Sequence, residues 1–89
     1  MKYNINKLCG MNNFSVRFDK NLDDEFINKL IKILNNFEIK EKNEDSIWLK
    51  SEEKDVLVYR YGEIVFLGFS EEDVKNVLNR VLELSLIHI

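Results

Sequence analysis

The sequence has no proline, three glycines, one cysteine and one histidine among its 89 residues. A single cysteine cannot form an intramolecular disulfide, which is typical of a protein in a reducing, cytoplasmic compartment. With His88 as the single histidine, no convincing Ser-His-Asp arrangement and no pair of Cys or His residues at zinc-ligand spacing can be assembled. Gly62 and Gly68 are too far apart and wrongly placed for a dinucleotide-binding motif. We therefore expect no enzyme, no metal and no cofactor.

Long apolar runs and an excess of positive charge are also missing. No run of about 18 apolar residues is present, which argues against a membrane-spanning helix. The first residues, MKYNINK, lack the apolar core of a signal peptide. The net charge of −3 argues against a strongly basic nucleic-acid binder, because Lys and Arg supply most of the non-specific affinity for phosphate. We therefore expect no membrane partner, and DNA affinity only where apolar contacts supply it.

Apolar residues make up 45% of the chain, enough for one core in a single domain of residues 1–89. The most informative stretch, residues 55–69, reads DVLVYRYGEIVFLGF and predicts two strands joined by a tight turn at Tyr61-Gly62. Successive side chains of a strand point to opposite faces. One face carries Val56, Val58, Ile64, Phe66 and Gly68, and the other carries Leu57, Tyr59, Val65, Leu67 and Phe69. A chain this short has helices for only one of these apolar faces, so the function depends on what covers the other.

The remaining segments predict three more strands and two helices. We expect a first strand over residues 3–18, with Gly10 at a bulge or close backbone approach, an edge strand over 37–41 and a strand over 46–51. A helix is expected over residues 22–36 with Asn21 as its N-cap, and a second helix after the cap residue Ser70. Each helix has one apolar stripe. The predicted fold is therefore α+β, a five-stranded antiparallel sheet with two helices on one face, in the order β-α-β-β-β-β-α.

This order of elements and several short motifs resemble a single repeat of the TATA-box-binding protein, of archaeal type. The motifs are a strand ending in an aromatic (residues 56–59, VLVY), a turn (60–63, RYGE), an apolar strand (64–69, IVFLGF) and an acidic helix start (70–73, SEED). The first strand at residues 15–18, SVRF, and the following Leu22 also align with that family. The resemblance covers residues 8–84 and implies a curved sheet whose concave face binds a widened DNA minor groove.

The resemblance also implies which residues would bind DNA. Cys9 and Met11 are expected on the second sheet face with the apolar residues of the two central strands. The candidate DNA-binding residues on this face are Met11, Leu57, Tyr59, Val65 and Leu67. Tyr59 matches one of two phenylalanines that wedge between base steps, but the second wedge falls near Asn43. Cys9 and Leu67 stand where the family has an asparagine and a threonine that contact bases, and Glu63 replaces a lysine that faces phosphate. The chain therefore resembles the family in its scaffold but lacks many of the residues that contact DNA in that family. This difference implies weak affinity for DNA.

The resemblance further implies a homodimer, because members of the family carry two such repeats and this chain has one. An unpaired edge strand is a template for pairing, and a two-fold contact between identical patches is the commonest assembly. The first strands are therefore the expected contact. The expected interface residues are Leu8, Cys9 and Met11.

Three functions remain open at this point. The first is a transcription-related, homodimeric module that binds double-stranded DNA weakly. The second is a protein-interaction module that keeps this scaffold without binding DNA, with its partner on the helical face. The acidic charge, Glu63 and Asn43 favour the second. The third is an adapter for RNA–DNA hybrids, because a related fold precedes the catalytic domain of some ribonucleases H.

Overall fold

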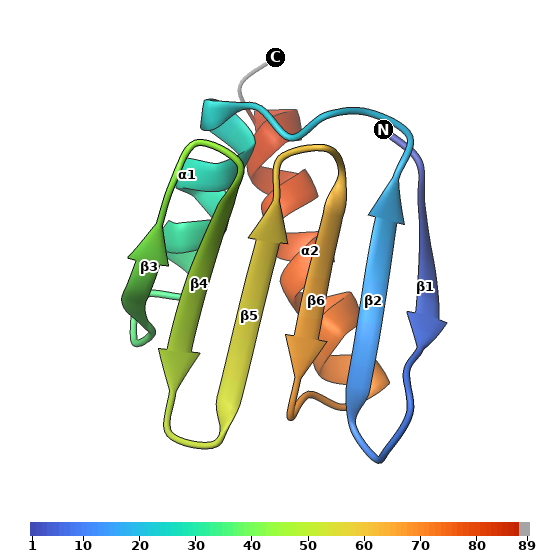
Figure 1. The fold of residues 1–89 in the computed structure, drawn as a ribbon. Helices are drawn as coiled ribbons and strands as arrows, with labels where there is room; N and C mark the ends of the chain where they lie inside the picture. The colour runs from blue at the N-terminus through green and yellow to red at the C-terminus, as the bar shows by residue number, and fades with distance from the viewer. Residues whose placement is uncertain (88–89) are drawn as a thin grey trace.

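The computed structural model describes residues 1–87, and the side chains of residues 1–83. The chain forms one antiparallel sheet of six strands in the order β1-β2-β6-β5-β4-β3, and two helices cover one face of it (Figure 1). The elements are β1 (Tyr3–Lys7), β2 (Asn13–Phe18), α1 (Asp24–Ile33), β3 (Glu38–Lys42), β4 (Ser46–Ser51), β5 (Lys54–Tyr59), β6 (Glu63–Leu67) and α2 (Glu71–Ile87). The small α+β fold with both helices on one face is confirmed.

The core lies between the sheet and the two helices. Alternate residues of β2, β4, β5 and β6 point toward the helices, as a half-covered sheet requires. Val16, Val56, Val58, Ile64 and Phe66 are fully buried there. From the other side, the apolar stripes of the helices supply Phe26, Ile27, Leu30, Val74, Leu78 and Val81. The buried apolar side chains thus lie on one face of the sheet, between the sheet and the helices.

The expectation of five strands is wrong, because residues 3–18 form a hairpin of two strands and not one strand. Residues 8–12 reverse the chain, and both Gly10 (φ +89°) and Asn12 (φ +61°) adopt the left-handed backbone that such a turn needs. The Asn13 side chain closes the turn by donating from Nδ2 to the Cys9 carbonyl at 3.0 Å. As a result β1 pairs with β2 along its whole length and occupies the edge at which a first-strand contact was expected.

Two smaller expectations also need correction. The N-cap of α1 is Asp23, whose carboxylate accepts from the Phe26 amide at 2.8 Å, and not Asn21. Phe69 does not lie on the second sheet face, because β6 ends at Leu67 and Gly68 (φ +83°) redirects the chain. Phe69 is buried in the core with its ring centroid 5.0 Å from that of Phe66. The cap of α2 is as expected, with Ser70 Oγ accepting from the Asp73 amide at 3.1 Å.

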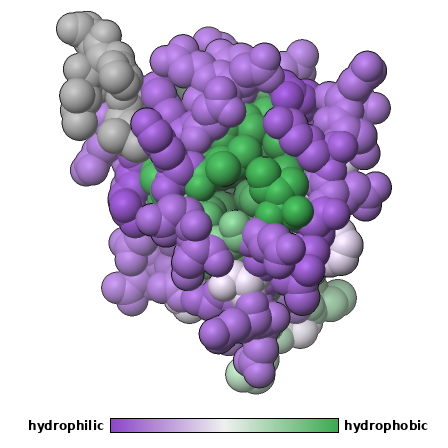
Figure 2. Space-filling model, turned by 90° about the vertical axis from the view of Figure 1, so that its left-hand side faces the viewer, coloured by the Kyte–Doolittle hydropathy of each residue, from purple (hydrophilic) through white to green (hydrophobic). Residues whose placement is uncertain are grey.

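The core is partly open on the side of β3 and α1. Figure 2, which views the molecule from that side, shows apolar side chains in a hollow ringed by hydrophilic ones. Ile39 pairs with the buried Leu49 and therefore points toward the helix layer, yet it is 44% exposed. A bulge between Ile39 and Glu41 and the charges of β3 protect this sheet edge from pairing with other strands.

Gly62→Ala is expected to lower the free energy of unfolding by about 2 kcal/mol or more. The added Cβ disfavours the backbone conformation at this position and also clashes with a neighbouring backbone atom. Gly62 has a φ of +121°, and a Cβ there would lie 2.7 Å from the Lys20 carbonyl oxygen, which belongs to the backbone. Gly10→Ala is the matched control, since its φ is +89° but its Cβ would meet only the Asn13 side chain, at 3.0 Å. Urea denaturation measures both variants. Equal destabilisation would contradict the close backbone approach at Gly62.

Candidate functional site

The sheet face opposite the helices, here called the open face, carries an apolar strip across its centre. Cross-strand pairing places Ser15, Val65, Leu57, Trp48 and Glu41 in one continuous row over β2, β6, β5, β4 and β3. Tyr59 lies one row to one side of Leu57, and Leu67 lies one row to the other side of Val65. The open-face strip comprises Trp48, Leu57, Tyr59, Val65 and Leu67, all half-buried. Apolar side chains left in partial contact with solvent make this strip a candidate binding surface.

The structure brings together most of the residues singled out in the sequence. Leu57, Tyr59, Val65 and Leu67 share the open face because strand alternation puts them there. Met11 does not join them, since it lies in the turn between β1 and β2 and is 84% exposed. Leu8 and Cys9 lie in the same segment, and Leu8 is 37% exposed. The expectation that Cys9 and Met11 lie on a sheet face is therefore wrong.

Trp48 belongs to the strip and was missed in the sequence. The signal was present, because Ile47 and Leu49 flank Trp48 in a strand and must point the other way. Both flanking residues are buried in the core, at 1% and 0% exposure. Trp48 therefore faces outward and is the only tryptophan of the chain, so its fluorescence and its indole N–H report directly on this face.

A hydrogen-bonded cluster around Glu63 borders the strip at one end. Glu63 Oε2 accepts from Ser15 Oγ at 2.5 Å, and the Tyr61 hydroxyl donates to Glu63 Oε1. Arg17 Nη2 lies 3.8 Å from the same carboxylate. Hydrogen bonds from Ser15 and Tyr61, together with the charge of Arg17, hold the pKa of Glu63 below 4.5, while the bond to Glu63 raises the pKa of Tyr61. Glu63 thus stays ionised and fixes the Tyr61 ring, which stacks on Tyr59 with centroids 5.7 Å apart.

A second carboxylate borders the other end of the strip in a similar way. Asp55 Oδ1 accepts from Trp48 Nε1 at 2.9 Å and from Lys50 Nζ at 3.3 Å. Asp55 therefore anchors one aromatic ring and one cation, as Glu63 does at the opposite end. Arg17 and Lys50, the cations of these two clusters, are both held by carboxylates of the chain itself.

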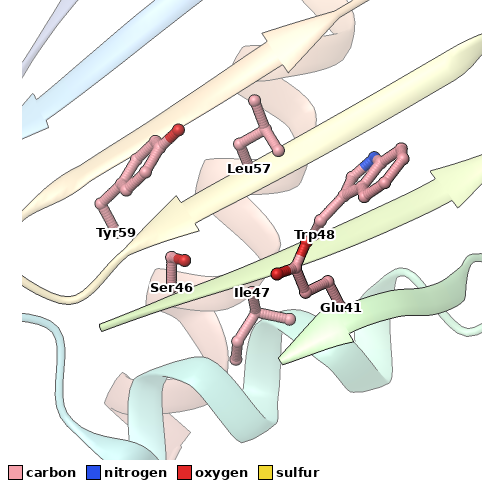
Figure 3. Close-up of a pocket in the computed structure, with 6 residues that line it drawn as sticks. All are labelled: Glu41, Ser46, Ile47, Trp48, Leu57 and Tyr59. Carbon is pink, nitrogen blue, oxygen red and sulfur yellow. The ribbon is translucent and has the colours of Figure 1, made fainter. Parts of the chain in front are cut away.

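Two hollows lie on the open face, and both are lined by Trp48 and Leu57. The first is lined by Glu41, Ser46, Ile47, Trp48, Leu57 and Tyr59 (Figure 3). The second is lined by Trp48, Lys50, Asp55, Leu57 and Leu67. Leu57 is common to both hollows, so a side chain entering either one contacts the centre of the strip.

The other chemistry considered in the sequence finds no counterpart among the described residues. In residues 1–83, no three His, Cys, Asp or Glu side chains gather as a metal ion would require. No described helix has the length and hydropathy to cross a bilayer. His88 lies outside the described residues. Comparison of the chain with models of protein families, with curated proteins and with solved structures finds no match. The geometry of the open face is therefore the observation from which a function can be proposed.

Ser15→Ala is expected to destabilise the fold at neutral pH by about 1 kcal/mol, because the Glu63 carboxylate loses a hydrogen bond. The bond lowers the pKa of Glu63 in the folded state. The hydrogen bond therefore stabilises the fold fully at pH values above 4.5, the ordinary pKa of Glu63. This stabilisation is lost as the pH falls through the lowered pKa that Glu63 has in the folded state. The difference in the free energy of unfolding between wild type and S15A, measured by urea denaturation, is expected to shrink as the solution is acidified through this window.

Ser46→Ala is the control for this prediction, because Ser46 lies on the same face and its hydroxyl contacts Asn43 rather than a carboxylate. Its effect on stability is expected to be the same at neutral and acid pH. An S15A effect that is equally independent of pH would show that the Ser15 bond to Glu63 is not made to the ionised carboxylate.

Proposed function

We propose that the chain is a protein-interaction module that binds an amphipathic helix of a partner protein on the open face of its sheet. The observation that carries this proposal is the apolar strip of Trp48, Leu57, Tyr59, Val65 and Leu67, bordered by polar clusters. An apolar centre with a polar rim and aromatic residues at its core is the anatomy of a protein–protein interface.

The dimensions of the strip fit one helix. The strip spans β4, β5 and β6, and three strands at about 4.8 Å spacing cover about 10 Å, close to the diameter of an α-helix. Along the strands it covers three rows from Tyr59 to Leu67, or about 14 Å, which corresponds to about nine residues of helix. The partner helix would therefore present apolar residues at positions i, i+3 or i+4, and i+7, the usual anchors of a helix in a groove.

The charges of the open face favour a protein over DNA. Arg17 and Lys50 already pair with Glu63 and Asp55, and Glu41 adds a further carboxylate beside Trp48. DNA binding depends on Lys and Arg side chains that neutralise phosphates and release counterions. A face whose cations already pair with carboxylates offers little of that free energy, whereas the Glu41 carboxylate can pair with a basic group of a protein.

The resemblance to a repeat of the TATA-box-binding protein is part of this proposal. From β2 to α2 the elements follow the order strand, helix, four strands, helix, which is the order that the resemblance implies. Leu57, Tyr59, Val65 and Leu67 also share the face that the family applies to DNA. We propose that this chain uses the corresponding face for a protein. A first-strand dimer of the kind implied by the family would have to form through β1, since β1 covers β2.

Selection from a displayed library of helical peptides tests the proposal. Enriched peptides are expected to share the i, i+3 or i+4, i+7 apolar pattern, and Leu57→Asp is expected to weaken their binding by about tenfold or more, because it buries a charge in the strip. Met11→Asp is the matched control, with the same kind of change at an exposed apolar residue outside the face. Circular dichroism and thermal unfolding confirm that both variants are folded.

Three results would contradict the helical partner. Enriched peptides that bind Leu57→Asp as well as wild type would exclude the open face. Saturable binding of a TATA-containing duplex at low salt, measured by fluorescence anisotropy and abolished by Leu57→Asp, would make DNA the ligand. A dimer in sedimentation at micromolar protein that Leu57→Asp dissociates would show that the strip is covered by a second copy of the chain.

A further inference from the structure

The first hollow of the open face combines three kinds of group. Trp48 and Tyr59 lie diagonally across β4 and β5 and line it on either side of Leu57 (Figure 3). Leu57 and Ser46 lie between them, and the Glu41 carboxylate comes from the neighbouring edge strand β3. We call this the Trp48–Tyr59 hollow. It has aromatic walls, an aliphatic contact and a negative charge at one side.

A side chain with a cationic head on an aliphatic stem matches these groups. Cations are attracted to the faces of Trp and Tyr rings, and a nearby carboxylate adds a charge-assisted hydrogen bond. The alkyl stems of Lys and Arg bury well against apolar side chains such as Leu57 while the charged head stays at the surface. A purely apolar side chain would make no electrostatic interaction with the Glu41 carboxylate, and an acidic side chain would be repelled by it.

Glu41 differs from the other carboxylates of the open face in its surroundings. Asp55 holds Lys50 and Trp48, and Glu63 holds Ser15, Tyr61 and Arg17. Among the described residues, no ion pair or hydrogen bond of the Glu41 side chain is found. Its partner across the sheet is Trp48, and both residues line the same hollow. An incoming cation therefore meets an available carboxylate at Glu41.

We propose that the Trp48–Tyr59 hollow binds a basic side chain, arginine or lysine, of the partner helix. This inference rests on the proposed function and adds a requirement to it, because the apolar face of the helix must be accompanied by one basic residue about one turn from an apolar anchor. The charged head contacts Glu41 and the aromatic rings, and the stem packs on Leu57. The second hollow, whose carboxylate already holds Lys50, takes the neighbouring apolar anchor.

Titration with acetyl-arginine amide, followed by the indole N–H signal of Trp48 and the Tyr59 amide signal in NMR spectra, tests this site on the intact chain. Saturable shifts are expected at millimolar probe. Acetyl-citrulline amide, which has nearly the same shape and no charge, is expected to give no saturable shift. Glu41→Gln is expected to weaken the arginine probe by about two- to fivefold, in line with an exposed ion pair.

Glu44→Gln is the matched control, because it removes the same charge three residues away in the exposed β3–β4 turn. Its effect on the arginine probe is expected to be negligible. Equal shifts from the arginine and citrulline probes, equal weakening by both variants, or no shift at Trp48 would each overturn the inference. Selected helices that bind the open face without any basic residue would overturn it while leaving the proposed function intact. Probe binding without any selected helix would contradict the helical partner and leave only the affinity of the hollow for a basic side chain.

Discussion

The structure depends on one constraint: the sheet has apolar side chains on both faces, but the two helices cover only one of these faces. Strands β5 and β6 carry apolar side chains on both faces and β4 adds Trp48 to the open one, but both helices pack on the same face. Burial on the helical side supplies the core, since each buried apolar side chain contributes about 1.5 to 3 kcal/mol relative to its exposed state. The opposite face keeps the same kind of side chains half-exposed, and a partner that covers them gains the corresponding free energy.

Polar groups at both ends of the strip hold aromatic side chains in place. Asp55 fixes the indole of Trp48 through a hydrogen bond, and Glu63 fixes Tyr61, which stacks on Tyr59. Rings held in place before binding lose less conformational entropy when a partner arrives. The same two carboxylates also pair with Lys50 at 3.3 Å and with Arg17 at 3.8 Å.

Strand alternation in residues 55–69 was enough to predict which side chains share each face, because a two-residue period leaves no other choice up to Leu67. It failed at Phe69, where the positive φ of Gly68 breaks the period. The hairpin in residues 3–18 could not be predicted from apolar spacing, since the reversal depends on left-handed Gly10 and Asn12. The clusters around Asp55 and Glu63 are likewise non-local, because they join side chains from different strands whose register was unknown. The family resemblance and the ligand remain predictions.

Site-specific photo-crosslinking in the host cell tests the central claim most directly, because it reports the face and the chemical class of the ligand together. Leu57 is replaced by benzoylphenylalanine, and Asn79, exposed on α2, is replaced in the same way as a control for the helical face. The account predicts an adduct from position 57 that protease digests and nuclease leaves intact, with none from position 79. A nuclease-sensitive adduct at position 57, or a protein adduct from position 79 alone, would contradict it.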